Sequence, residues 1–283
     1  MKNLQGKTAL ITGASRGIGT FIAQALAKEK MNLILVARTS DSLEKVAAGL
    51  SLQQTSVKCI PADIGQRDQL EILVKRAEAE FNGVDVLVNN AGLESTYPYE
   101  KLETEIIDQI IKVNLVAPMI LARLFLPKMI ERGRGHIVNI SSLSGLVGTP
   151  YEEVYAASKH GLVGFTRSLR LTAIGESYPV GVSVICPGFI SKAGMWDTTS
   201  KESGLDAPAI FGTLPPENVA KAVVSAIIKD KAEVIVNSMP FRPFLLLQAL
   251  LPSVAPFLTL KTGSVELFKG IAQHKMKGTI QKR

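Results

Sequence analysis

The sequence predicts an α/β fold: a doubly wound, seven-stranded parallel sheet with helices on both faces. Apolar runs that suit buried strands alternate with stretches long enough for helices, which is typical of β-α-β units. The chain has 283 residues, of which 46% are hydrophobic and 20% charged. That composition excludes a mainly disordered chain and suffices for one large domain with a sizeable core.

Each strand is predicted from an apolar run, and each helix from the longer stretch that follows it. The predicted strands are Thr8–Thr12, Asn32–Ala37, Ser56–Pro61, Val84–Asn89, Gly135–Ser141, Val180–Cys186 and Glu233–Val236. The predicted helices are Gly17–Glu29, Asp41–Leu50, Arg67–Phe81, Thr104–Arg132, Glu153–Glu176 and Pro216–Asp230. Residues 188–215 are predicted to be an unusually long loop, and loops of that length are usually functional or mobile.

Neither a metal site nor a disulfide scaffold is expected. Cys59 and Cys186 lie far apart inside apolar runs, and His136, His160 and His274 lack the spacing of metal ligands.

The N-terminus lacks the apolar stretch of a signal peptide, so we expect a cytoplasmic protein.

Most of the net charge of +7 lies at the C-terminal end. Residues 261–283 hold six basic residues and one acid, whereas residues 1–260 are nearly neutral. The segment has one aromatic residue, Phe268, and no arginine cluster. A nucleic-acid partner is therefore not expected.

A glycine-rich turn follows the first predicted strand. Its spacing is G-x-x-x-G-x-G, and the residues predicted to hold a ligand are Gly13, Ser15, Arg16, Gly17, Ile18 and Gly19. Glycines let the backbone approach a pyrophosphate, whose charge is favoured at the N-terminus of the following helix. A turn without a ligand is the alternative, but the strand–turn–helix context favours a dinucleotide.

The residues at the end of the second strand indicate whether the dinucleotide is NADP(H) or NAD. A carboxylate there would bind a ribose diol, but the strand ends at Ala37 and Arg38 follows. Arg16 and Arg38 can both bind a 2′-phosphate through paired hydrogen bonds, which favours NADP(H) over NAD. The alternative is that both arginines are solvated surface charges.

Tyr155 and Lys159 are spaced to share one face of a helix. An ammonium and an oxidised nicotinamide near the phenol would lower its pKa toward neutrality, as proton transfer requires. Taken alone, the pair is explained better as two exposed polar residues of an amphipathic helix.

The motifs together resemble those of the short-chain dehydrogenase/reductase family. They are the glycine turn, Asn89-Asn90-Ala91-Gly92, Ser142 thirteen residues before Tyr155, Tyr155-xxx-Lys159, and Pro187-Gly188. The resemblance covers residues 4–237 in the expected order. It implies a Rossmann-type catalytic domain over residues 1–237, with residues 238–283 as a C-terminal helical extension.

The resemblance also implies the roles of the site residues. Tyr155 would be the general acid or base, and Lys159 would lower its pKa and hold the nicotinamide ribose. Ser142, or alternatively Ser141, would hydrogen-bond the substrate oxygen. Asn114 would hold a water molecule in a proton relay. The remaining implied cofactor contacts are Asp63, Ile64, Asn90, Ala91, Gly92, Pro187, Gly188 and Ile190. The family commonly has a threonine where this chain has Lys192, which leaves the geometry of that loop open.

These expectations describe an NADP(H)-dependent oxidoreductase that interconverts a carbonyl and an alcohol. The residues expected near the substrate are mostly apolar, which favours a lipophilic ketone or aldehyde. The alternatives are a β-ketoacyl-thioester reductase of lipid synthesis and a non-catalytic NADP-sensing or membrane-adaptor protein. A homodimer or homotetramer is expected from the family.

The last segment has two open interpretations. Eighteen residues without a charge separate Arg242 from Lys261, and three prolines disfavour a membrane-spanning helix. One is a helical hairpin packed over the substrate mouth or a subunit interface. The other is a peripheral membrane contact through residues 240–283, and the two are compatible.

Overall fold

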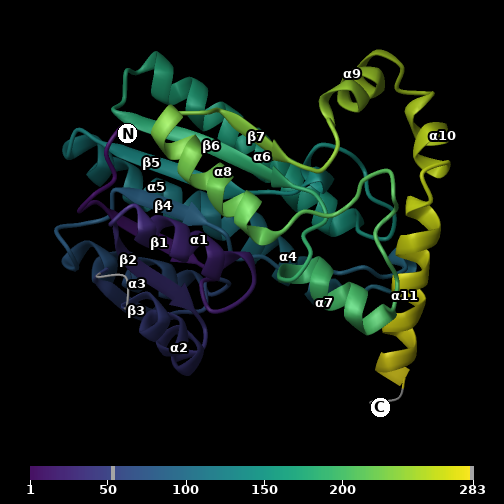
Figure 1. Cartoon of the computed structure of the whole chain (residues 1–283), viewed down its shortest axis with the longest axis horizontal. Coiled ribbons are helices and arrows are strands. Elements are labelled where there is room, and N and C mark those ends of the chain that lie inside the picture. Colours follow the sequence, from purple (N-terminus) through teal and green to yellow (C-terminus); the bar gives the residue numbers. More distant parts are fainter. Residues whose placement is uncertain (52–54, 281–283) are drawn as a thin grey trace.

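The computed structural model describes residues 1–51 and 55–280, and it has the predicted α/β architecture (Figure 1). All seven strands are parallel, in the order β3-β2-β1-β4-β5-β6-β7. The strands are β1 (Thr8–Thr12), β2 (Asn32–Ala37), β3 (Val57–Pro61), β4 (Val86–Asn89), β5 (Gly135–Ile140), β6 (Val180–Pro187) and β7 (Glu233–Val236). The order reverses direction between β1 and β4, which is where ligands bind in such sheets.

Helices cover both faces of the sheet. The longer ones are α1 (Ile18–Lys28), α2 (Ser40–Ser51), α3 (Arg67–Ala79), α4 (Thr104–Ile111), α5 (Ala117–Glu131), α6 (Glu153–Gly175), α7 (Gly194–Ser203) and α8 (Pro216–Lys229). Short 3₁₀ turns lie at Tyr99–Lys101 and Leu143–Gly145. Successive residues of a strand point to opposite faces. Ile11 therefore packs in one core with Ile22 of α1, and Leu10 in the other core with Phe125 of α5.

The helix predicted at Thr104–Arg132 contains a local irregularity. α4 and α5 are joined by a π-helical turn, Lys112–Val116, so that the whole runs from Thr104 to Glu131. Within the described residues it is the one helix long and apolar enough to cross a membrane. Leu121, Ala122 and Phe125 are instead buried in the core between α5 and the sheet. The core helices of soluble proteins often have the same length and composition.

The prediction of a loop over residues 188–215 is wrong in part, because α7 forms inside it. α7 begins at Gly194, whose φ of +90° lies in the left-handed region, and Gly204 caps its end at φ +70°. Asp197 and Lys201 form an ion pair one turn apart, 2.7 Å between charged atoms. Because only Thr199 is buried, the helix has no apolar periodicity from which it could be predicted.

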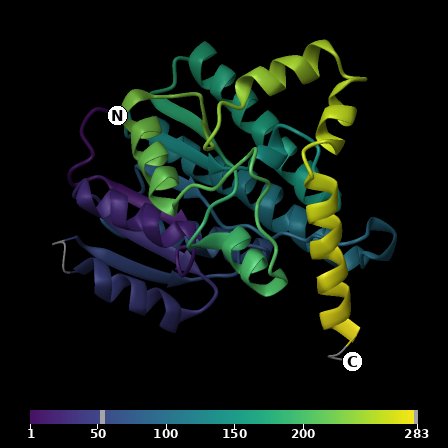
Figure 2. The same ribbon diagram turned by 45° about the vertical axis from the view of Figure 1, so that its right-hand side comes forward.

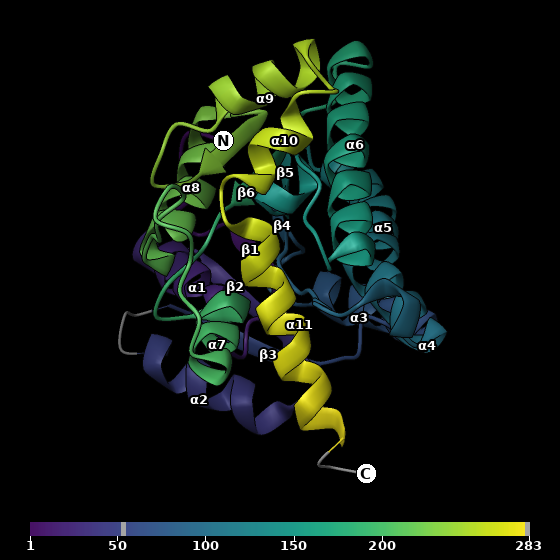
Figure 3. The ribbon, with the colours of Figure 1, turned by 90° about the vertical axis from the view of Figure 1, so that its right-hand side faces the viewer.

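The C-terminal extension forms three helices, where one interpretation was a hairpin. They are α9 (Arg242–Leu250), α10 (Ala255–Leu260) and α11 (Ser264–Ile280). α9 and α10 lie at the edge of the molecule and project away from the sheet (Figures 1 and 2). α11 passes across the ends of the strands, beside α7 (Figure 3). Lys282 and Arg283 of the predicted basic segment lie outside the described residues.

A buried chain of polar side chains joins the sheet to α6. Asn89 of β4 donates to Asn139 of β5 over 2.8 Å, and Asn139 donates to the Thr166 hydroxyl of α6 over 2.8 Å. The Thr166 hydroxyl donates in turn to the carbonyl of Leu162. All three side chains are buried, so each depends on its partners in the chain rather than on water.

We predict that Thr166→Val lowers the free energy of unfolding by about 1 to 3 kcal/mol, because the buried Asn139 amide loses its acceptor. Urea unfolding measures the change. Thr172→Val is the matched control on the same helix, since Thr172 is exposed. Equal stability losses in the two variants would contradict the role of the buried network.

Candidate active site

The residues predicted for catalysis meet where β4, β5 and β6 end. Ser142 lies two residues beyond β5, and Tyr155 and Lys159 lie in the first two turns of α6. Asn114 lies in the π-helical turn between α4 and α5. Asn114, Tyr155 and Lys159 are all buried. Four residues from three segments of the chain thus converge at one end of the sheet.

Lys159 is anchored by the backbone of β5. Its Nζ donates to the carbonyl of Ile140 over 2.9 Å and lies 5.6 Å from the centre of the Tyr155 ring. Burial lowers the pKa of Lys159 to about 8. The ammonium therefore sits beside the catalytic phenol with a single carbonyl as its hydrogen-bond partner among the described residues.

The pKa of Tyr155 is shifted upward in the structure, whereas a downward shift was expected beside an ammonium. Burial raises its pKa above the usual range, the carboxylate of Glu152 raises it further, and a hydrogen bond with Ser142 lowers it. Desolvation of the phenolate is the largest cause of this shift, and Lys159 is not among its causes, so the lowering of the pKa by Lys159 stays a prediction. The effect of an oxidised nicotinamide stays a prediction.

The two candidate serines have different surroundings. Ser142 is half-buried, hydrogen-bonds Tyr155, and accepts a hydrogen bond from the backbone of Ser144 over 3.1 Å. The hydroxyl of Ser141 instead donates to the carbonyl of Lys159 over 3.1 Å. Ser142 is therefore the serine beside the phenol, and Ser141 ties β5 to α6.

Asn114 is held by three hydrogen bonds. Its side chain accepts from the backbone N–H of Leu93 and donates to the carbonyl of Leu93, both over 2.8 Å. It also donates to the hydroxyl of Ser158 over 3.0 Å. Single π-helical turns often occur at functional sites. Here the turn fixes the segment after β4 against α6.

The glycine turn is packed closely enough to require glycine. Gly13 has φ +67°, and a Cβ on it would lie 2.8 Å from the Cα of Ala91. The side chain of Asn90 donates to the carbonyls of Thr12 and Gly13, and the backbone of Asn90 donates to the Thr12 hydroxyl. Thr12 thus braces the segment after β4.

The turn also leaves donors free for a phosphate. The N-terminus of α1, preceded by Gly17, has no side-chain cap. Arg16 and Arg38 are exposed, and within the described residues neither has a hydrogen-bond or ion-pair partner. Ser15 and Ile18 are half-buried and Gly19 is buried behind them. An uncapped helix end with two free guanidiniums fits the diphosphate and 2′-phosphate of NADP(H).

The remaining predicted cofactor contacts surround the same end of the sheet. The carboxylate of Asp63 accepts from the backbone of Gly65 over 3.0 Å, and Ile64 is buried. Gly92 lies against the active site, because a Cβ on it would be 3.6 Å from the Nζ of Lys159. Pro187 ends β6, and Gly188 donates to the carbonyl of Val236 over 2.9 Å.

The loop after Gly188 differs from the family pattern in sequence, but backbone contacts hold it in place. Ile190 forms a β-bridge with Leu214, and Ser191 donates its backbone N–H to the same residue over 3.0 Å. Lys192, which replaces the threonine of the family, is exposed with φ +63° in the left-handed region. This loop is therefore fixed through its backbone.

The family model for short chain dehydrogenases matches residues 7–204. The chain belongs to this family, the short-chain dehydrogenases/reductases. It is an oxidoreductase family that acts on CH–OH groups, and membership confirms the resemblance and the fold predicted from the sequence.

Individual relatives agree with the assignment. The chain is 41% identical over 240 residues to a ketoacyl reductase, HetN, of Nostoc sp., which covers 85% of this chain and 82% of that protein. A metagenomic short-chain oxidoreductase in complex with NADP is 31% identical, with a TM-score of 0.70, covering 83% of this chain and 98% of that one. A short-chain dehydrogenase/reductase from Burkholderia phymatum in complex with NAD has a TM-score of 0.80 at 24% identity, covering 90% and 96%.

Sequence reasoning missed two carboxylates beside Tyr155. Glu152 is buried and accepts from the Thr96 hydroxyl over 3.0 Å. Glu94 accepts from the Thr199 hydroxyl of α7 over 2.8 Å and pairs with Lys275 of α11 over 3.5 Å. Burial and the charge of Glu94 raise the pKa of Glu152 to about 8. Glu94 and Glu152 are far apart in the sequence, so no local pattern could reveal their proximity.

The raised pKa of Glu152 makes the stability of the fold depend on pH. From about pH 4.5 to about 8 the unfolded chain ionises this carboxyl while the fold keeps it protonated, so stability falls as the pH rises. We predict that Glu152→Gln removes this loss and gains stability relative to the native chain, on the order of 1 to 3 kcal/mol between pH 5 and pH 8.

Denaturant midpoints at the two pH values measure the effect. Glu153→Gln is the control, since that neighbouring carboxylate is exposed. If Glu152→Gln and Glu153→Gln show the same pH dependence, Glu152 is not protonated in the fold.

Proposed function

We propose that this chain is an NADP(H)-dependent oxidoreductase that interconverts a lipophilic ketone or aldehyde and its alcohol. The observation that carries the proposal is the set of Asn114, Ser142, Tyr155 and Lys159 at the end of the sheet, of which all but the half-buried Ser142 are buried. A non-catalytic NADP-sensing or membrane-adaptor protein would have no need of such a set.

Each of the four side chains has a proposed task. When bound, the nicotinamide cofactor supplies or accepts the hydride. The phenolic oxygen of Tyr155 delivers a proton to the substrate oxygen in reduction and removes it in oxidation, while the Ser142 hydroxyl hydrogen-bonds that oxygen. Lys159, fixed on the carbonyl of Ile140, offsets negative charge on the phenolate. Asn114 orders the backbone of Leu93 and the proton path on that side.

Replacing Tyr155 by Phe tests this function. We predict that turnover of NADPH with a reactive carbonyl falls at least about 100-fold, because general acid catalysis is lost. Binding of NADPH, measured by fluorescence, should stay close to that of the native chain. Undiminished turnover in Tyr155→Phe would overturn the proposed mechanism.

The proposed preference for NADP(H) depends on Arg16 and Arg38. The NADP-bound metagenomic relative supports it, while the NAD-bound structural neighbour shows that the fold also serves the other cofactor. We predict that Arg38→Ala weakens NADPH binding about tenfold or more and leaves NADH binding nearly unchanged, since only NADPH has a 2′-phosphate. Titrations with both nucleotides measure this.

Arg76→Ala serves as the control for that experiment, because Arg76 is an equally exposed arginine of α3 away from the turn. Parallel losses for NADPH and NADH in Arg38→Ala would mean that Arg38 does not read the 2′-phosphate.

The substrate class is proposed from an aromatic cluster next to the site. Phe189, directly after Gly188, packs on Trp196 of α7 at 4.5 Å between ring centres and on Phe268 of α11 at 6.4 Å. Leu267 and Ile271 of α11 belong to the same cluster. These side chains favour a lipophilic substrate. A β-ketoacyl-thioester reductase is the second candidate, supported by the ketoacyl reductase of Nostoc sp..

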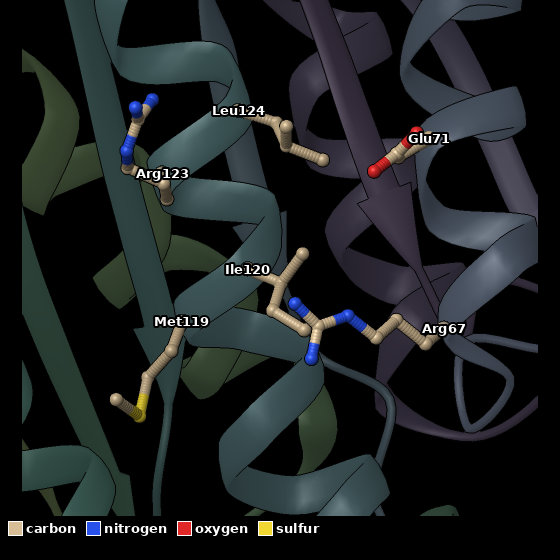
Figure 4. A pocket seen from close by; sticks show the side chains of 6 residues that line it. All are labelled: Arg67, Glu71, Met119, Ile120, Arg123 and Leu124. Carbon is tan, nitrogen blue, oxygen red and sulfur yellow. The ribbon is translucent and has the colours of Figure 1, made fainter.

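A homodimer or homotetramer is part of the proposal. Val116 and Met119 near the start of α5, and Leu171 and Ile174 on α6, are exposed apolar side chains that a subunit interface would cover. A hollow of about 370 Å³ lies between α3 and α5, and Figure 4 shows Arg67 and Glu71 of α3 facing Ile120 and Leu124 across it. None of the predicted site residues lines this hollow, so it fits a subunit contact better than the substrate.

Three further expectations from the sequence stay proposals. Residues 1–237 are proposed as the catalytic domain and residues 238–283 as its extension. We also propose a cytoplasmic protein whose residues 240–283 make a peripheral contact with a membrane.

A further inference from the structure

The helix α9 is apolar yet buries none of its side chains. It reads Arg-Pro-Phe-Leu-Leu-Leu-Gln-Ala-Leu, and no residue in it is buried. A helix that is apolar on most sides is ordinarily found inside a protein or a membrane. Leu246 is 64% and Leu250 77% exposed. The described part of the chain therefore covers this helix only in part.

The exposed apolar side chains continue from α9 into α10. Half of the large hydrophobic side chains exposed in the described residues lie in residues 239–260, a short stretch of the chain. They are Met239, Leu246, Leu250, Leu251, Val254, Phe257 and Leu260. We call this set the apolar face. Exposed apolar side chains gathered in one short stretch of the chain indicate an interaction site, whereas scattered single ones need no explanation.

The charge around the apolar face identifies its partner. Arg242 and Lys261, both exposed, bracket the segment, and Glu266 is the single acid between residues 238 and 283. Within the described residues Lys261 and Lys269 have no ion-pair partner, while Arg242 lies 3.7 Å from Glu233. Two copies joined through this face would bring like charges together. A lipid bilayer with anionic headgroups complements the apolar side chains through its interior and the positive charges through its surface.

An aromatic path connects α9, which carries part of the apolar face, to the candidate active site. Phe244 of α9 contacts Phe241 at 5.5 Å between ring centres, and Phe241 contacts Phe211 at 6.2 Å. Phe211 contacts Phe189 at 6.1 Å. Phe189 belongs to the aromatic cluster beside Gly188. α9 is therefore linked by apolar contacts to the region proposed to receive a lipophilic substrate.

From these observations we infer that the apolar face of α9 and α10 docks on a lipid bilayer that carries anionic headgroups. This inference deepens the membrane contact in the proposed function by assigning its surface and its lipid partner. Docking brings the aromatic path toward the lipid phase, from which a lipophilic carbonyl compound can reach Phe189.

Vesicle flotation of the full chain tests the inference. The probes are vesicles of phosphatidylcholine alone and of phosphatidylcholine with phosphatidylglycerol, at low and high salt. We expect binding to the anionic vesicles that weakens as salt rises. The double variant Leu250→Ser/Phe257→Ser should lose at least tenfold in the fraction bound. Ile72→Ser is the matched control, because Ile72 is an exposed apolar side chain of α3, and it should bind as the native chain does.

Two further readouts separate the outcomes. NADPH binding and turnover of a water-soluble carbonyl should be unchanged in the double variant, which shows that it folds and keeps this test independent of the proposed reaction. Failure of the native chain to bind either vesicle, or equal binding by the double variant, overturns the inference. If light scattering shows that the double variant loses a self-association of the native chain while vesicle binding is unaffected, the occupant is a second copy and the inference is wrong.

Discussion

The buried ammonium of Lys159 is the constraint on which the candidate site depends. It lies in a low-dielectric environment with the carbonyl of Ile140 as its anchor, and burial brings its pKa down to about 8. Placing a cation there is unfavourable unless negative charge develops nearby. Tyr155 is the adjacent group that can supply that charge, and its own raised pKa keeps it protonated until it does. The fold therefore holds the phenol of Tyr155 beside the ammonium of Lys159, and the negative charge of a phenolate would stabilise that ammonium.

The surrounding elements serve to keep that pair in place. Asn114 fixes the segment after β4, Ser141 joins β5 to α6, and the chain of Asn89, Asn139 and Thr166 ties α6 to the centre of the sheet. α7 and α11 then close the site from outside, through Phe189, Phe268 and the ion pair between Glu94 and Lys275. Rigid support of a few polar groups by a packed scaffold is what a positioned proton donor requires.

Much of the sheet could be predicted from the sequence because its central strands are buried on both faces. β1, β2 and β7 match the predicted residues throughout, and the other strands differ only at their ends. The motif residues were found because their spacing is local. α7 was missed because its exposed side chains carry no apolar period, and the pairing of Glu94 with Glu152 and Lys275 was missed because it is created only by folding. The helical extension was expected, but the path of its three helices is set by contacts with distant parts of the chain, such as that of α11 with α7.

A titration of the Tyr155 phenol tests the central claim most directly. The absorbance of phenolate near 295 nm is followed with pH in the native chain and in Tyr155→Phe, and their difference isolates this tyrosine. The account predicts that without cofactor the difference signal does not appear below the ordinary tyrosine range near 10. Saturation with NADP⁺ should shift it to clearly lower pH, because the cation favours the phenolate. An identical titration with and without NADP⁺ would contradict the account.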